Sequence, residues 1–96
     1  MTQFNQENFD QDLSSGKKLY IYHYLSGCGP CKNITPHVED FSAGRDNVYF
    51  ITPSDQAEIP TDLHPGAYPT LFVIENNFVL KKLIGQSDII NELKNG

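Results

Sequence analysis

The sequence has 96 residues, of which 39% are apolar and 11% aromatic, and its formal net charge is −5 at pH 7. This length predicts one domain over residues 1–96, large enough to bury a hydrophobic core without structural metals. The acidic balance and the lack of a basic patch argue against nucleic-acid binding. No apolar run approaches the roughly 20 residues needed to cross a bilayer, so membrane insertion is not expected.

The N-terminal residues lack the positive segment and the apolar run of a signal peptide, so the sequence predicts a cytoplasmic protein. Its only cysteines, Cys28 and Cys31, are three positions apart. A disulfide between them would close a loop too short to restrain much of the unfolded chain. In a reducing compartment, we therefore expect a catalytic or metal-binding role for this pair rather than a structural one.

The first predicted elements are a helix and a strand. Asn5 can cap a short helix that runs to about Ser14, with Phe9 and Leu13 on one face. Residues 18–25 (KLYIYHYL) are rich in β-branched and aromatic side chains. They predict a central strand that is apolar on both faces.

A turn over residues 26–30 leads into a second helix, which is expected to end at Ala43-Gly44. One stripe of this helix is expected to be buried, and it holds Cys31, Ile34, Val38 and Phe41. Pro36 lies inside the helix, where it removes the backbone hydrogen bond to the Lys32 carbonyl. We therefore expect a kink at this proline.

The connection to the second half of the chain is the part that the sequence determines least. Residues 48–52 predict a short buried strand. Residues 54–63 predict a weak helix or an irregular connection, because Pro60 interrupts any regular helix there. The conformation of the whole segment 53–66 stays open.

The last elements are a hairpin and a helix. Strands are expected over residues 70–75 and 78–84, joined by Asn76 and Asn77, since Asn tolerates the positive φ of a tight turn. Ser87 is expected to cap a final helix. Its inward face holds Ile89, Ile90 and Leu93. Taken in order, these elements predict an α/β fold with a mixed sheet of four to five strands and helices on both faces.

The segment Cys28-Gly29-Pro30-Cys31 follows a predicted strand and opens a predicted helix, a context typical of redox-active pairs. Residues three apart in a helical turn lie roughly 5–6 Å from each other, which suits the roughly 4.4–6.8 Å between Cα atoms in disulfides. Unpaired N–H groups at the helix start favour a thiolate on Cys28, whereas Cys31 lies on the buried stripe. Pro30 suits the first helical turn, and Gly29 leaves the sulfur open to a partner chain.

Half of a zinc site is the alternative interpretation of the two cysteines. Zinc prefers four ligands, and the sequence has no second cysteine pair. His23, His37 and His64 could in principle complete a site. The Gly-Pro pair at a helix start suits a redox centre better, so we expect no metal and no bound cofactor.

These features resemble the thioredoxin family. The Cys-Gly-Pro-Cys segment matches the family's active-site motif, and Pro36 matches its helix-kinking proline. The segment Tyr68-Pro69-Thr70 matches its apolar-Pro-Thr segment, and Gly85 matches the glycine after the last strand. The resemblance extends from about residue 19 onward and implies the thioredoxin fold.

The resemblance also implies a substrate-binding surface. In the family, the proline of the apolar-Pro-Thr segment is cis and faces the cysteines. The backbone of the preceding residue, here Tyr68, is then free to pair with an extended substrate. Gly27, Pro69, Ile84 and Gly85 would complete the apolar surface beside the reactive sulfur.

Three positions depart from the family pattern. Gly27 stands where the family has Trp, Tyr22 where it has a buried acid, and Phe50 where it has the lysine that partners this acid. Because both members of the charge pair are replaced, no charge is left unpaired in the core. The family acid is thought to help deprotonate the second cysteine. The sequence does not show which group removes the proton from Cys31 in this protein.

The residues and the resemblance together predict a monomeric thiol–disulfide oxidoreductase of the protein-disulfide reductase type. Its substrates would be disulfide-containing proteins, and a thioredoxin reductase supplied by NADPH would return it to the dithiol form. Alternatives are a thioredoxin-like binding subunit or scaffold, a glutaredoxin-like enzyme that uses glutathione, and an oxidant or isomerase. The Gly-Pro pair favours a reductant, and the lack of a basic patch disfavours the glutaredoxin.

Overall fold

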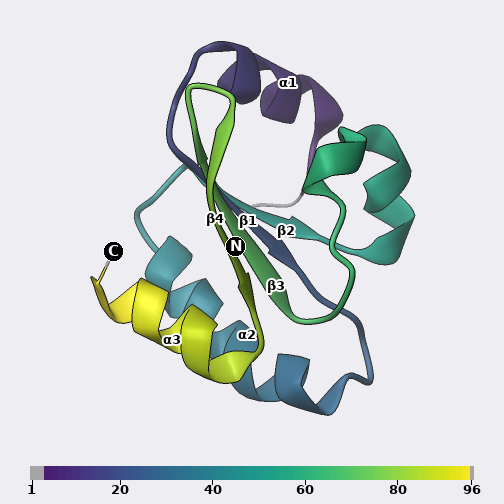
Figure 1. The fold of residues 1–96 in the computed structure, drawn as a ribbon, viewed down its shortest axis with the longest axis vertical. Helices are drawn as coiled ribbons and strands as arrows, with labels where there is room; N and C mark the ends of the chain where they lie inside the picture. Colours follow the sequence, from purple (N-terminus) through teal and green to yellow (C-terminus); the bar gives the residue numbers. More distant parts are fainter. Residues whose placement is uncertain (1–3, 96) are drawn as a thin grey trace.

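The computed structural model describes residues 4–95 and contains four strands, three α-helices and two 3₁₀ helices. In chain order these are α1 (Gln6–Ser14), β1 (Leu19–His23), α2 (Gly29–Ser42), β2 (Val48–Ile51), η1 (Pro53–Glu58), η2 (Thr61–Leu63), β3 (Thr70–Glu75), β4 (Phe78–Ile84) and α3 (Gln86–Asn95) (Figure 1). The strands form one sheet in the order β2-β1-β3-β4. β1 runs parallel to β2 and antiparallel to β3, which confirms the predicted mixed sheet.

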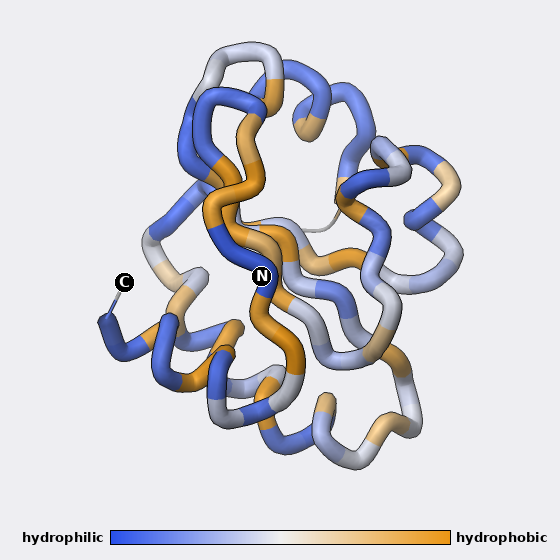
Figure 2. The backbone as a smooth tube through the Cα atoms, viewed as in Figure 1, coloured by the Kyte–Doolittle hydropathy of each residue, from blue (hydrophilic) through white to orange (hydrophobic). Residues whose placement is uncertain are grey.

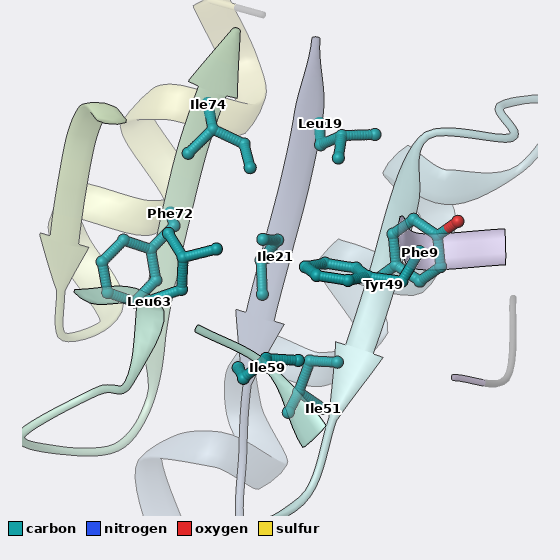
Figure 3. Close-up of a cluster of buried hydrophobic side chains, with 9 residues drawn as sticks. All are labelled: Phe9, Leu19, Ile21, Tyr49, Ile51, Ile59, Leu63, Phe72 and Ile74. Carbon is teal, nitrogen blue, oxygen red and sulfur yellow. The ribbon is translucent and has the colours of Figure 1, made fainter. Parts of the chain in front are cut away.

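Helical elements cover both faces of the sheet. One face packs on α1 and the 3₁₀ helices, and the other packs on α2 and α3 (Figure 1). Because side chains alternate along a strand, Leu19 and Ile21 of β1 join the first layer, while Tyr20 and Tyr22 join the second. Figure 3 shows the cluster of the first layer, and Figure 2 shows how the apolar residues concentrate along the central strands.

Local signals account for most element boundaries. The Asn5 side chain accepts a hydrogen bond of 3.0 Å from the Asn8 N–H, which caps α1 as predicted. Asn76 and Asn77 have φ angles of 54° and 66°, so the β3–β4 hairpin turns where the sequence predicted it. Pro36 lies inside α2.

Several boundaries differ from the sequence predictions, and two of these differences are of one residue: β1 begins at Leu19 rather than at residue 18, and β2 ends at Ile51 rather than at residue 52. β1 ends at His23 rather than at residue 25, because its partner β2 ends at Ile51, which pairs with His23. Ser87 lies inside α3 and does not cap it, because the helix begins at Gln86, directly after Gly85. Segment 53–66 contains the two 3₁₀ helices and no α-helix. No helix within residues 4–95 is long and apolar enough to span a membrane.

Candidate active site

Cys28 and Cys31 form a disulfide at the beginning of α2. Cys28 is the residue immediately before the helix, and Cys31 lies in its first turn, with 5.2 Å between their Cα atoms. The Cys31 N–H donates to the Cys28 sulfur over 3.2 Å, and the Lys32 N–H donates to the Cys28 carbonyl over 3.1 Å. The Cys28 sulfur therefore occupies the position of a helix-capping acceptor, where backbone N–H groups favour negative charge.

The two sulfur-bearing side chains differ in their access to solvent. Cys31 is 1% exposed and lies on the buried face of α2 with Ile34 and Val38. Cys28 is half-buried, and Gly29 beside it is exposed. Gly27 has a φ of +83°, and a Cβ built on it would meet no atom within 4 Å. An approaching chain therefore finds space next to Cys28.

The strand register brings the predicted docking surface to the same end of the sheet. We use this name for Gly27, Tyr68, Pro69, Ile84 and Gly85. The last residue of β1, His23, pairs with Thr70 at the start of β3, and Thr70 pairs in turn with Ile84 at the end of β4. The Gly85 N–H donates to the Pro69 carbonyl over 3.1 Å. The loop that leads to Cys28 leaves β1 at this same end (Figure 1).

The peptide bond between Tyr68 and Pro69 is cis, as the resemblance to the thioredoxin family implied. Pro69 is buried and Tyr68 is half-buried, and the Tyr68 hydroxyl accepts a hydrogen bond from the Gln56 side chain. Ile84 is 48% exposed and presents apolar surface. Gly85 has a φ of +92°, a conformation that favours glycine at the turn between β4 and α3.

Tyr22 is fully buried between the sheet and α2. Its ring contacts Phe50 edge-on with 5.7 Å between centroids, as expected for residues paired across β1 and β2. Its hydroxyl forms a 2.8 Å hydrogen bond with the hydroxyl of Thr35, one helical turn beyond Cys31. Burial raises the pKa of Tyr22 to about 12, so this side chain is neutral at pH 7. The sequence reasoning missed Thr35; its one signal was a hydroxyl four positions after Cys31.

His23 is buried against the opposite layer. Its Nε2–H donates to the Leu63 carbonyl over 2.8 Å, while Nδ1 is buried with no hydrogen-bond partner. Burial lowers the pKa of His23 to about 4, so the ring is neutral at pH 7. This contact ties the end of β1 to η2.

The three histidines do not gather around the cysteines as a zinc site would require. His23 and His64 each bond a backbone carbonyl, of Leu63 and Ile59 respectively, and His37 is exposed on α2. Within residues 4–95, no three His, Cys, Asp or Glu side chains are grouped to hold a metal ion.

Comparisons with known proteins agree on one family. The family model described as Thioredoxin matches residues 1–95. Thioredoxin of Mycoplasmoides gallisepticum is 31% identical over 83 residues, which span 84% of this chain and 83% of that protein. Thioredoxin of Staphylococcus haemolyticus is 32% identical over 81 residues, spanning 81% of this chain and 77% of that protein. The crystal structure of Malassezia sympodialis thioredoxin aligns with a TM-score of 0.76 at 26% identity, covering 99% of this chain and 86% of that one.

Proposed function

Because this chain belongs to the thioredoxin family and is a thiol–disulfide oxidoreductase, we propose that it reduces protein disulfides with Cys28 as attacking thiol and Cys31 as resolving thiol. It has the α/β thioredoxin fold. The observation that carries the assignment is the difference in access between the two cysteines. Cys31 is 1% exposed, whereas Cys28 is half-buried at the helix start.

The proposed cycle begins with both cysteines reduced. The Cys28 thiolate attacks one sulfur of a partner disulfide, so a mixed disulfide forms and the other partner sulfur leaves as a thiolate. Cys31 then loses its proton and attacks the Cys28 sulfur. This step forms the Cys28–Cys31 disulfide and releases the second partner thiolate, and each partner thiolate takes up a proton. Two electrons and two protons have then passed from this protein to its partner.

We propose that the docking surface holds the partner during this exchange. Its members surround the end of the sheet from which the loop to Cys28 leaves, and Ile84 supplies exposed apolar area. The backbone of Tyr68 is the proposed pairing site for an extended partner segment. We further propose a thioredoxin reductase as the electron donor that restores the dithiol, and a cytoplasmic, monomeric protein.

Trapping of the mixed disulfide tests the roles of the two cysteines. Cys31→Ser protein, mixed with insulin as a disulfide substrate, should accumulate a covalent complex, because nothing is left to attack the Cys28 sulfur. Cys28→Ser protein should accumulate none, and the double serine variant is the control for nonspecific coupling. The reverse pattern would exchange the two roles.

A measured redox potential tests the direction of the reaction. Equilibration with glutathione should give a potential near that of reducing members of the family, about −270 mV. A value near that of strong oxidants, about −120 mV, would contradict the proposed reductant and favour an oxidant. Wild-type protein that fails to reduce insulin with dithiothreitol as donor would instead favour a scaffold.

A further inference from the structure

Next to Cys31 the surface forms a hollow of about 350 Å³ that is separate from most of the docking surface. One wall is the loop over residues 24–27, and the other is the first two turns of α2. The α2 residues that line it are Cys31, Lys32, Thr35 and Pro36. The hollow shares Gly27 with the docking surface, but it includes none of that surface's other members.

The walls of this hollow are mostly apolar, and two of their residues contact the buried Tyr22. The ring of Tyr24 stacks on that of the buried Tyr22, with 5.6 Å between centroids and 8° between planes. Tyr22 is in turn bonded to Thr35, another wall residue, over 2.8 Å. Gly27 contributes no side chain, so the hollow stays open where the loop meets Cys28. A volume at the lower end of the range for ligand sites suits one large side chain.

The charge of Lys32 at the edge of the hollow indicates which kind of group would bind there. Lys32 is the one charged side chain among the residues that line the hollow, and it is exposed on the first turn of α2. The chain as a whole carries a net charge of −5, so the positive charge of Lys32 is opposite in sign to the charge of the protein. An acidic group in the partner would gain from Lys32 and from the positive end of the α2 dipole.

We propose that this hollow is a side-chain subsite for the disulfide substrate. It takes an aromatic side chain one or two residues from the attacked cystine, with an adjacent acidic residue against Lys32. Cys31 lines the hollow and is bonded to Cys28, so a chain attacked at Cys28 is within one or two residues of it. The inference rests on the proposed function and names the class of substrate that this site prefers.

A set of four disulfide peptides tests the subsite. They carry Phe or Ala next to one cysteine, and Glu or Lys beside that position. Second-order rate constants are measured with prereduced protein, the peptide products being separated by chromatography after acid quenching. We expect Phe to react about 10-fold faster than Ala, as removal of an apolar contact in a pocket typically gives. Glu should exceed Lys several-fold at low salt, and high salt should remove this difference.

Two variants and their matched controls locate the effect. Lys32→Glu should reverse the Glu-over-Lys preference, whereas Lys94→Glu, the same charge change on α3, should leave it unchanged. Leu25→Trp, which fills the hollow, should remove the Phe preference. Leu80→Trp, on the exposed edge strand β4, should keep that preference.

Failure of the subsite is distinguishable from failure of the proposed function. If wild-type protein reduces all four peptides at one rate, the subsite is overturned while reduction stands. A Glu preference that survives in Lys32→Glu also overturns it, and this surface change is not expected to prevent folding. If neither the peptides nor insulin are reduced, the proposed function fails.

Discussion

Tyr22 and His23 are neighbours on β1, and they face opposite layers of the molecule. Tyr22 points to α2, where aromatic rings surround it and the Thr35 hydroxyl completes its hydrogen bonding. His23 points to η2, bonds the Leu63 carbonyl through Nε2, and keeps Nδ1 buried without a partner. Both side chains lie at the end of the sheet that leads to the cysteines.

The difference follows from the kind of element that each side chain supports. α2 has 14 residues and satisfies most of its own backbone groups, so the sheet needs to offer it mainly apolar packing. η2 has three residues, and its Thr61 carbonyl accepts from the His64 N–H, whereas its Leu63 carbonyl is bonded by the His23 side chain. The contact of the sheet with α2 at Tyr22 is therefore made by neutral groups, whereas the contact with η2 at His23 includes a titratable ring beside the apolar cluster of that layer.

Placing a charge in the Tyr22 layer should have the largest effect. Tyr22→Asp puts a carboxyl group at a fully buried position whose cross-strand neighbour, Phe50, offers no opposite charge. We expect a loss of about 3–5 kcal/mol in the free energy of unfolding, typical of an unpaired buried charge. Urea unfolding of wild type and variant at pH 7 measures it.

Adding Phe50→Lys provides the internal control. A lysine directly opposite the new carboxylate should recover part of the loss, and the double-mutant cycle should show coupling between the two sites. Phe50→Lys alone should also destabilise. A Tyr22→Asp protein as stable as wild type, or a cycle without coupling, would contradict the neutral packing of this layer.

The same contrast shows how far the sequence could predict the structure. The bounds of β3 and β4 follow from local signals, because two Asn residues with positive φ define the hairpin. The cysteine pair at the start of α2 follows from the Cys-Gly-Pro-Cys segment and its position between a predicted strand and a predicted helix. The prediction for Ser87 was wrong because serine is a good capping residue. Only Gly85 separates the end of β4 from the start of α3 at Gln86, so Ser87 lies inside the helix.

The parts that could not be predicted depend on distant pairing. The end of β1 is set by where β2 stops, and no pattern within residues 18–25 contains that information. The partner of His23 is a carbonyl 40 residues away, in the segment whose conformation the sequence left open. The Tyr22–Thr35 hydrogen bond likewise joins a strand to a helix, and the sequence around a single threonine in a helix does not indicate which group its hydroxyl will bond.

Lowering the pH should decrease the free energy of unfolding through the protonation of His23. The pKa of His23 falls from 6.5 to about 4 on folding, mainly because burial disfavours the charged ring; the hydrogen bond to the Leu63 carbonyl opposes this shift, and the nearby His64 and Lys82 side chains add to it. Below pH 6.5, His23 of the unfolded chain binds a proton, whereas His23 of the folded chain stays neutral until about pH 4. The free energy of unfolding therefore decreases as the pH falls from 6.5, and the decrease levels off below about pH 4. The full shift corresponds to about 3 kcal/mol.

His23→Phe separates this effect from the titration of carboxylates. The variant loses the bond to the Leu63 carbonyl, worth about 1 kcal/mol at every pH, and it also loses the proton-linked penalty. We therefore expect it to be slightly less stable than wild type at pH 7 and more stable at about pH 4.5. A stability difference that stays constant with pH would show that His23 does not carry the dependence.

The smallest expected effect concerns the hydroxyl pair that completes the Tyr22 layer. Thr35→Val keeps the branched shape of the side chain, so helix propensity changes little, but it leaves the Tyr22 hydroxyl without its 2.8 Å partner. We expect a loss of about 1–2 kcal/mol in the free energy of unfolding. Tyr22→Phe removes the other hydroxyl and should cost about 1 kcal/mol. In the double variant no polar group is left unpaired, so its loss should be smaller than the sum of the two single losses. Thr35→Ser, which keeps the hydroxyl, should restore most of the stability. Strictly additive losses in urea melts would mean that the two hydroxyls stabilise the fold independently, and that the hydrogen bond between them contributes nothing.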